Sequence, residues 1–238
     1  METVIFGASR QGRVVLEVLR AQGQHPILGF LDDDAAKHGI LVDGERVLGG
    51  MEWAAANAAT AAPQRARDLA GAGGDRRLAA IVAIGSNDAR LDLAARLRAL
   101  GFDLINAVHP SAVIQGNVSI GTGNLVCAGA ILITGTRVED DVVINTGSTI
   151  DHDSLLETGA QVASGVTTSG CVTIRQGAFV GAGAILGPGV TVGERAIVGA
   201  GSLVLQDIPP GVLAYGAPCR VVRQLTDPVD WGSMLAGR

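Results

Sequence analysis

The sequence of 238 residues has few aromatic side chains and no excess of basic ones. Phe, Trp and Tyr make up 3% of the chain, and 18 Lys and Arg residues are outnumbered by 23 Asp and Glu residues, which leaves a formal net charge of -5. Nucleic acids are bound mainly through clustered basic residues and through aromatic rings that stack on bases. Nucleic acid is therefore excluded as an expected partner.

Long apolar runs are missing too. No stretch approaches the roughly 20 apolar residues that cross a bilayer. The chain opens with a short apolar segment at residues 4–6 instead of the basic start and long apolar core of a secretory signal. We therefore predict no membrane insertion and a cytoplasmic location.

Cysteine and histidine are scarce. The three cysteines, Cys127, Cys171 and Cys219, are odd in number and far apart, which fits reduced thiols and not a disulfide framework. The four histidines are not clustered, and no C-x-x-C pair is present, so no metal site is predicted. A cysteine nucleophile is also disfavoured, because the sequence shows no histidine paired with any cysteine.

A six-residue repeat is the dominant pattern that the sequence does contain. Residues 112–207 divide into 16 hexads without one insertion. The third position is aliphatic in every hexad but one, where Thr168 stands, and Gly often fills the sixth position. A lone hexad cannot bury its aliphatic residue, but stacked coils align these residues into ladders that fill an interior. The repeat therefore predicts a parallel β-helix, with its domain at residues 109–207.

The first 108 residues follow a different pattern. Apolar runs at residues 3–6, 27–31 and 78–84 indicate buried strands, with a further short strand at 104–106. Helices are expected between them, at residues 13–21 and 88–100, the second capped by Ser86 or Asn87. Strands that alternate with helices predict a small parallel sheet flanked by helices, as in a Rossmann-like α/β domain.

Two segments fall outside these patterns. Residues 52–77 form an Ala-rich insert, which we interpret as a helix followed by a loose linker. Residues 208–238 follow the repeat as a closing segment and a tail, and residues 226–238 are expected to be disordered.

The turn at residues 7–12 lies between a predicted strand and a predicted helix. Backbone N–H groups and the helix dipole favour an anion there, so phosphate binding is one interpretation and a purely structural turn is the other. The turn is neither a P-loop nor the dinucleotide fingerprint, which has Gly where Ser9 stands. Asp32 follows Gly12 by about twenty residues, where such folds contact a ribose or base.

His152 is the one histidine inside the repeat. It stands between Asp151 and Asp153 at the fifth position of its hexad, so it is expected near a corner, where it can project outward while Ile150 points inward. Flanking carboxylates orient an imidazole and raise its basicity, as a general base near neutral pH requires. The spacing alone leaves a catalytic and a merely solvated histidine equally open. His109, just before the first hexad, is expected at a domain junction.

Together these features resemble the bacterial hexapeptide-repeat sugar acetyltransferases, of the sialic acid O-acetyltransferase and UDP- or GDP-4-amino-sugar N-acetyltransferase type. The resemblance rests on residues 5–9, 30–33, 83–87, 106–112, 144–147 and 151–153, which occur in the family's order. It implies a left-handed β-helix with three hexads per coil. It also implies a homotrimer that binds acetyl-CoA and a nucleotide sugar, with the active site between neighbouring subunits.

The resemblance also implies roles for individual residues. His152 corresponds to the catalytic base and Asp153 to the acid that follows it. The residues expected to bind the nucleotide sugar are Gly7, Ala8, Ser9, Arg10, Gly12, Asp32, Asp33, Gly85 and Asn145. The residues expected to bind acetyl-CoA are Gln161, Gly170, Ala182 and Arg220.

The chain departs from the family's pattern at two informative places. Arg10, Gln11 and Gly12 stand where the family commonly has Gly-His-Gly, so a guanidinium is expected to meet a phosphate. Gln161 stands where many members have a second histidine, so only hydrogen bonding is expected of it. N-acetylation of a nucleotide-linked amino sugar is the favoured function. O-acetylation of sialic acid or a related sugar, and a non-catalytic trimeric scaffold, are the alternatives.

Overall fold

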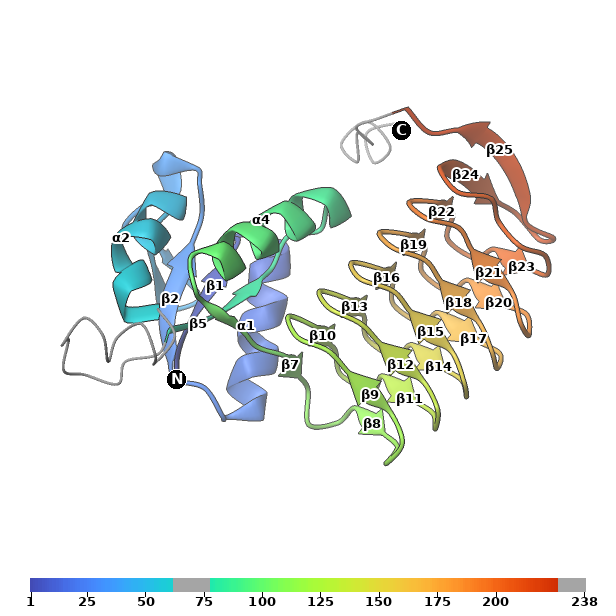
Figure 1. The fold of residues 1–238 in the computed structure, drawn as a ribbon, viewed down its shortest axis with the longest axis horizontal. Coiled ribbons are helices and arrows are strands. Elements are labelled where there is room, and N and C mark those ends of the chain that lie inside the picture. The colour runs from blue at the N-terminus through green and yellow to red at the C-terminus, as the bar shows by residue number, and fades with distance from the viewer. Residues whose placement is uncertain (62–77, 227–238) are drawn as a thin grey trace.

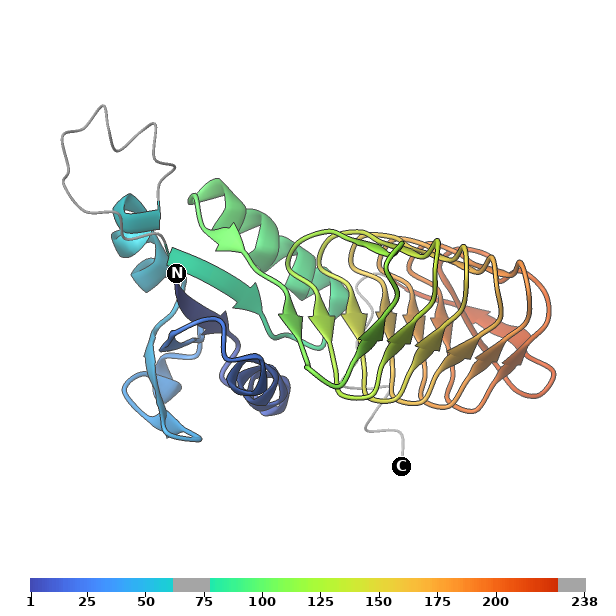
Figure 2. The same ribbon diagram turned by 90° about the horizontal axis from the view of Figure 1, so that it is seen from below.

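The computed structural model describes residues 1–61 and 78–226. They form an N-terminal α/β domain at one end of a long β-helix (Figures 1 and 2). The α/β domain is built on a six-stranded sheet of order β3-β4-β2-β1-β5-β6. Its strands are β1 Glu2–Phe6, β2 Ile27–Leu31, β3 Leu41–Val42, β4 Glu45–Gly49, β5 Leu78–Val82 and β6 Asp103–Leu104. All neighbours pair in parallel except β3 and β4, which are antiparallel.

The sheet confirms the three main strands expected from the apolar runs. The short strand expected at residues 104–106 instead begins at Asp103 and ends at Leu104. The β3–β4 hairpin was not predicted, because its two-residue first strand is too short to show an alternating pattern and lies on the exposed edge.

Within residues 1–61 and 78–226, three α-helices accompany the sheet. They are α1 Arg10–Gln22, α2 Met51–Ala61 and α4 Asn87–Ala99, and a short 3-10 turn, η1 Ala35–Lys37, lies between β2 and β3. The turn expected at residues 7–12 is shorter than predicted, because α1 already begins at Arg10. Gly12 makes this early start possible, since a Cβ atom there would lie 2.0 Å from the carbonyl oxygen of Gly7. The helix expected after residue 52 is α2. The linker expected at the end of the insert, and the tail, lie outside the described residues.

The β-helix follows the six-residue period. Each of the 16 predicted hexads contains one two-residue strand, from β8 Val113–Ile114 to β23 Leu203–Val204. The strands form three sheets, which we call I, II and III. Sheet I has the order β25-β24-β22-β19-β16-β13-β10-β7, sheet II β23-β20-β17-β14-β11-β8, and sheet III β21-β18-β15-β12-β9. The intervening strands of the three sheets are β9 Ser119–Ile120, β10 Leu125–Val126, β11 Ile131–Leu132, β12 Arg137–Val138, β13 Val143–Ile144, β14 Thr149–Ile150, β15 Leu155–Leu156, β16 Gln161–Val162, β17 Thr167–Thr168, β18 Thr173–Ile174, β19 Phe179–Val180, β20 Ile185–Leu186, β21 Thr191–Val192 and β22 Ile197–Val198.

Both ends of the β-helix extend beyond the predicted repeat. Strand β7 (Ala107–Val108) pairs with β10 in sheet I, so the first strand of the β-helix lies just before residue 109. At the other end, β24 (Val212–Tyr215) pairs with β22, and β25 (Arg220–Gln224) folds back on β24 in antiparallel fashion.

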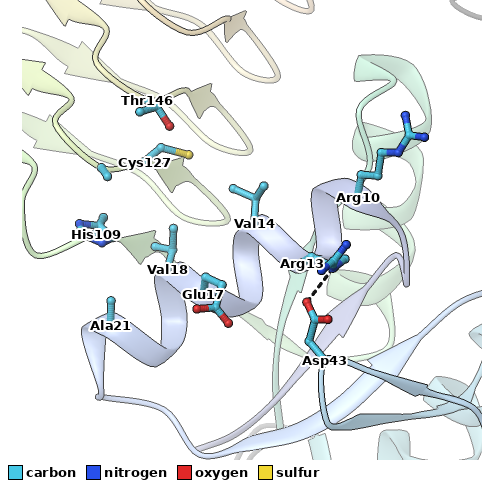
Figure 3. A pocket seen from close by; sticks show the side chains of 11 residues that line it. Arg10, Arg13, Val14, Glu17, Val18, Ala21, Asp43, His109, Cys127 and Thr146 are labelled. Atoms are coloured by element: carbon cyan, nitrogen blue, oxygen red, sulfur yellow. Dashed lines mark hydrogen bonds and ion pairs between the residues drawn. The ribbon is translucent and has the colours of Figure 1, made fainter.

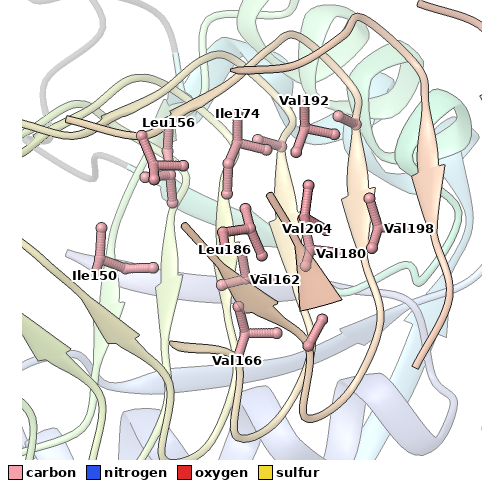
Figure 4. Close-up of a cluster of buried hydrophobic side chains, with 14 of the residues drawn as sticks. Ile150, Leu156, Val162, Val166, Ile174, Val180, Leu186, Val192, Val198 and Val204 are labelled. Carbon is pink, nitrogen blue, oxygen red and sulfur yellow. The ribbon is translucent and has the colours of Figure 1, made fainter. Parts of the chain in front are cut away.

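The interior is filled by the aliphatic residues of the third hexad position, as Figure 4 shows for Ile150, Leu156, Ile174 and their neighbours. Within one sheet, stacked partners are 18 residues apart, as for Val126 and Ile144. Ile114, in the first coil, is 36% exposed because fewer coils cover it. Thr168, the one polar residue of the ladder, is nevertheless buried.

A buried arginine on α4 joins the two domains. The Nε group of Arg90 donates to the carbonyl oxygen of Asp141, at 3.0 Å, and its Nη2 donates to that of Gly159, at 2.8 Å. Its Nη1 donates to Gln161 Oε1, at 3.4 Å. The two remaining bonds stay inside the α/β domain, to the carbonyl oxygen of Ile84 and to the side chain of Asn87. All five N–H groups of the guanidinium therefore have an acceptor.

Sheet I of the β-helix is the face that receives the α/β domain. Leu125 and Val143 of this sheet belong to the same buried cluster as Val15 and Leu16 of α1. In Figure 2, α1 and α4 both lie on the side of the α/β domain that meets the first coils. Across residues 1–61 and 78–226, no helix is long and apolar enough to cross a bilayer.

Candidate functional site

His152 lies at the corner where the chain passes from sheet II to sheet III. The turn at residues 151–154 connects β14 to β15 and leaves 51% of the His152 side chain exposed. Its Nδ1 lies 2.9 Å from Asp153 Oδ2. The hydrogen bond to Asp153 raises the pKa of His152 above its ordinary value, and the negative charge of Asp151 adds to the effect. The expected projection of His152 from a corner is thus seen in the structure.

Two buried threonines hold the peptide just before His152. Thr168 Oγ1 accepts a hydrogen bond from the backbone N–H of Asp151 at 2.9 Å, and the Thr136 hydroxyl donates to the carbonyl oxygen of Asp151 at 3.1 Å. Both threonine side chains are buried. The one interruption of the aliphatic ladder therefore lies where it can fix the backbone that carries the imidazole.

The next coil places Gly170 and Cys171 beside this turn. The backbone N–H of Cys171 donates to the carbonyl oxygen of His152 at 2.8 Å. A Cβ atom on Gly170 would lie 2.4 Å from both Cε1 and Nε2 of His152, so the ring packs directly over this glycine. Cys171 is exposed, and one ligand atom each from His152, Asp153 and Cys171 lie within 4.8 Å of one another.

This neighbourhood of a cysteine and a histidine was missed in the sequence. The two residues are 19 positions apart and share no local motif. The signal that could have found them is the coil length, because residues 18 positions apart stack on each other, and Cys171 follows Asp153 by 18.

The second group of predicted residues gathers at the carboxyl edge of the six-stranded sheet. Gly7, Ala8 and Ser9 follow β1, and Gly85 lies between β5 and α4. The strand order reverses between β1 and β5, and ligands of open parallel sheets bind at such a switch point. Ser9 makes no side-chain capping hydrogen bond within the described chain. The N–H groups in the first turn of α1 are therefore available to an anion, and the exposed Arg10 stands at the same end.

The two aspartates after β2 already have partners in the protein. Asp32 Oδ2 accepts from the backbone N–H of Ala8 and from Lys37 Nζ, both at 2.9 Å, and its Oδ1 accepts from the N–H of Asp34. Burial alone would raise the pKa of Asp32, but the hydrogen bonds from Lys37, Asp34 and Ala8 outweigh it and hold the pKa below its ordinary value. Asp33 Oδ1 accepts from the N–H of Met51 at the start of α2. Both carboxylates thus order the loops of this edge.

A groove of about 530 Å³ separates α1 from the corner between sheets I and II (Figure 3). Arg10, Arg13 and Val14 line it from the helix, and Cys127 and Thr146 line it from the β-helix. Arg13 is paired with Asp43, and His109 contributes from the domain junction, as expected from its position. Burial raises the pKa of the Cys127 thiol to about 11, so this thiol stays protonated at neutral pH.

The other predicted residues are distributed over the β-helix. Asn145 lies at the corner of sheets I and II, where its Nδ2 donates to the carbonyl oxygen of Val162, and the exposed Ala182 occupies the same corner further along. Gln161 lies in sheet I, where it is buried and its side chain accepts from Arg90. The structure therefore does not bring Gln161 to the corner of His152. Arg220 lies in β25, at the end of the β-helix far from the α/β domain (Figure 1).

Comparison with protein families gives two matches. Residues 2–97 match the PglD N-terminal domain, and residues 171–206 match the bacterial transferase hexapeptide (six repeats). A UDP-N-acetylbacillosamine N-acetyltransferase of Bacillus subtilis is 33% identical over 128 residues. That alignment includes 52% of this chain and 50% of the relative, so the chain spans about half the length of this curated relative.

Solved structures match over almost the whole chain. PerB from Caulobacter crescentus, in complex with CoA and GDP-perosamine, is 35% identical over 94% of this chain and 98% of that chain, with a TM-score of 0.81. The acetyltransferase domain of PglB from Neisseria gonorrhoeae, in complex with acetyl coenzyme A, is 28% identical over 93% of this chain and 98% of that chain, with a TM-score of 0.80.

Proposed function

We propose, because this chain belongs to the bacterial hexapeptide-repeat sugar acetyltransferases, that it transfers the acetyl group of acetyl-CoA to the amino group of a nucleotide-linked amino sugar. The observation that carries the proposal is the His152–Asp153 pair, held at an open corner of the β-helix against Gly170. The similarity to PerB, whose structure contains CoA and GDP-perosamine, supports the same class of donor and acceptor.

In this reaction His152 is the general base. Asp153 accepts the Nδ1–H hydrogen bond, which leaves Nε2 as the proton acceptor. Nε2 takes a proton from the sugar amine as the amine nitrogen attacks the thioester carbonyl carbon. In this proposal the backbone N–H of Gly170 stabilises the oxyanion that forms. When the C–S bond breaks, the protonated imidazole returns a proton to the leaving thiolate, so that CoA leaves as a thiol.

In this proposal the nucleotide of the substrate binds at the carboxyl edge of the six-stranded sheet. The free N–H groups at the start of α1 and the Arg10 guanidinium supply positive charge for a diphosphate. Gly7 and Gly12 let the turn pack tightly beneath this site, because a Cβ atom on Gly7 would lie 2.6 Å from the carbonyl oxygen of Ala83 and one on Gly12 would lie 2.0 Å from that of Gly7. Asp32 and Asp33 shape this site through the loops that they hold, and Gly85 borders it from the β5 side.

The acetyl donor lies along the corners of the β-helix in this proposal. Gly170 and Ala182 offer corner positions without bulky side chains, whereas Asn145, at the corner of sheets I and II, offers an amide to the nucleotide sugar. Arg220 at the far end supplies a positive charge for the phosphates of CoA. Gln161 affects acetyl-CoA binding only indirectly in this proposal, since its side chain accepts a hydrogen bond from Arg90 beneath the α/β domain.

Within a single chain, the nucleotide site of the α/β domain and the corner of His152 lie on different sides of the β-helix. The α/β domain covers sheet I, whereas His152 lies on the corner of sheets II and III, the edge of the prism opposite sheet I. The outer face of sheet II also exposes aliphatic side chains, among them Val113 and Ile185, which is typical of a surface that another protein chain covers. We place three copies around an axis beside sheet II, so that His152 of one copy faces the groove beside α1 of the next.

Thiol release from acetyl-CoA tests the proposed function. The untagged protein is incubated with a panel of UDP- and GDP-linked amino sugars, and with sugars that offer only hydroxyl groups. The His152→Ala variant should keep the fold and lose on the order of 10²- to 10⁴-fold in turnover, the usual contribution of a general base. His25→Ala, in the α/β domain, is the matched control. Full turnover by His152→Ala would refute the proposal.

The same panel separates the alternatives. An O-acetyltransferase would release thiol with sugars that lack the amino group, and a non-catalytic scaffold would release none with any sugar. Sedimentation of the same protein tests the trimer independently of turnover.

A further inference from the structure

The corner of His152 contains three kinds of metal-ligating side chain. His152, Asp153 and Cys171 are all exposed, and one potential ligand atom from each lies within 4.8 Å of the other two. In residues 1–61 and 78–226, this is the one group of three or more His, Cys, Asp or Glu side chains found within such a distance. The proposed acetyl transfer uses His152 and Asp153 but assigns no role to Cys171.

The backbone holds these side chains in a fixed relation. Asp153 and Cys171 occupy the sixth hexad position of successive coils, where Gly135 and Gly189 stand in the coils on either side. The values of φ are 57° for Asp153 and 60° for Cys171, in the left-handed region that favours glycine. The hydrogen bond from the N–H of Cys171 to the carbonyl oxygen of His152 ties the two turns together.

We propose that His152, Asp153 and Cys171 form a binding site for Zn²⁺ or a similar divalent transition metal, and that a metal bound there blocks the catalytic base. An imidazole nitrogen, a carboxylate oxygen and a thiolate sulfur are the three ligand types that Zn²⁺ takes in proteins, with bonds of about 2.0–2.3 Å. Water supplies the fourth ligand at this open corner. The Cys171 thiol gives its proton to solvent when the metal–sulfur bond forms.

The required rearrangement is small. Ligand atoms around a tetrahedral Zn²⁺ lie about 3.3–3.8 Å apart, so the longest separation, at most 4.8 Å, must close by about 1 Å. If Nδ1 is the ligand atom, its 2.9 Å separation from Asp153 Oδ2 must open slightly. All three are exposed and can rotate without disturbing the core. The carboxylate of Asp151, which lowers the local potential at the imidazole, adds to the attraction for a cation.

A metal on this site competes with the chemistry. Metal binding through either imidazole nitrogen impairs catalysis. Nε2 is the proposed proton acceptor, and Nδ1 carries the hydrogen bond to Asp153. Inhibition of turnover rests on the proposed function, but binding of the metal does not. The two are therefore measured separately.

Calorimetric titration of the full, untagged chain with Zn²⁺ alone measures binding. We expect one site per chain in the wild type, and no binding of Mg²⁺, which prefers an oxygen shell. Cys171→Gly restores the glycine of the neighbouring coils and keeps the turn. It should weaken Zn²⁺ binding by at least about tenfold, the loss that even an indirect partner causes at a metal site. Cys219→Ala, which removes a buried thiol elsewhere, is the matched control and should bind as the wild type does.

Two further measurements complete the test. Co²⁺ in place of Zn²⁺ should give a thiolate-to-metal charge-transfer band that Cys171→Gly lacks. In the turnover assay, Zn²⁺ should inhibit the wild type at concentrations that leave Cys171→Gly active. Equal Zn²⁺ binding by the wild type and Cys171→Gly, or no binding by an active wild type, would overturn the metal site and leave the proposed function standing. Zn²⁺ binding by a chain that shows no turnover would instead overturn the proposed function alone.

Discussion

Replacing Arg90 by lysine should weaken the contact between the two domains while keeping the positive charge. The guanidinium makes five hydrogen bonds, and three of its acceptors, at Asp141, Gly159 and Gln161, belong to the β-helix. Burial lowers the pKa of Arg90 to about 10, so the group is still charged at neutral pH. An ammonium has three N–H donors in place of five. At least two of the five acceptors therefore lose their partner in the Arg90→Lys variant.

The magnitude follows from this count. A buried acceptor left without a donor costs about 1–3 kcal/mol, so two of them lower the free energy of unfolding by about 2–6 kcal/mol. Chemical denaturation followed by circular dichroism measures the loss. Arg96→Lys is the matched control, because Arg96 lies on the same helix, is exposed, and pairs with Asp92 across one turn. Its effect should stay within about 0.5 kcal/mol.

Hydrogen exchange shows where the loss occurs. In Arg90→Lys, protection should fall in α4 and in the turn at residues 157–160, on which Arg90 is anchored. It should persist in β20 and β23, which are far along the β-helix. An unfolding free energy within about 0.5 kcal/mol of the wild type, with unchanged exchange in α4, would refute the reasoning.

Three smaller changes test the corner of His152. Asp153→Asn removes the partner that raises the pKa of His152; because the base works in its neutral form, the acid limb of kcat/KM should move to lower pH, and an unmoved limb would contradict this. Gly170→Ala places a Cβ atom 2.4 Å from the imidazole and should lower kcat by about tenfold or more without a change in Tm. Gly116→Ala, which meets no atom within 4 Å, is its control and should leave kcat unchanged. Thr168→Val restores an aliphatic ladder residue but removes the acceptor for a backbone N–H; it should lower kcat while the unfolding free energy falls by no more than about 1–3 kcal/mol, and Thr168→Ser should recover the rate.

The β-helix could be predicted in detail because its period is both short and uninterrupted. Each hexad must place one aliphatic side chain inside, so the third position identifies each strand and its inward-facing residue and places His152 near a corner. The α/β domain could be predicted at the level of its main strands, which are apolar runs. Its hairpin β3–β4 could not, because the edge strand β3 has two residues and pairs with β4 through two residue pairs, too few to show a pattern of their own.

The contacts between distant segments are the part that no local pattern contains. Arg90 stands in an Ala- and Leu-rich helix, where an arginine is ordinarily solvated, and its burial depends on carbonyl oxygens 51 and 69 residues away. The position of Gln161 beneath Arg90 likewise follows from domain packing, which the repeat does not describe. Cys171 is an intermediate case, since the 18-residue coil predicts its neighbour once the number of hexads per coil is known.

The uniform coil length also defines which insertions the molecule can absorb. Duplicating 18 residues adds one layer of about 4.8 Å to the prism and leaves every ladder continuous. Inserting six residues keeps the aliphatic side chains inside but shifts every later strand to the next sheet of the β-helix. Placed between β11 and β14, such an insertion would move the imidazole from its own edge to the adjacent one while the interior stays filled. An insertion that leaves every sheet in register must therefore contain a whole number of 18-residue coils.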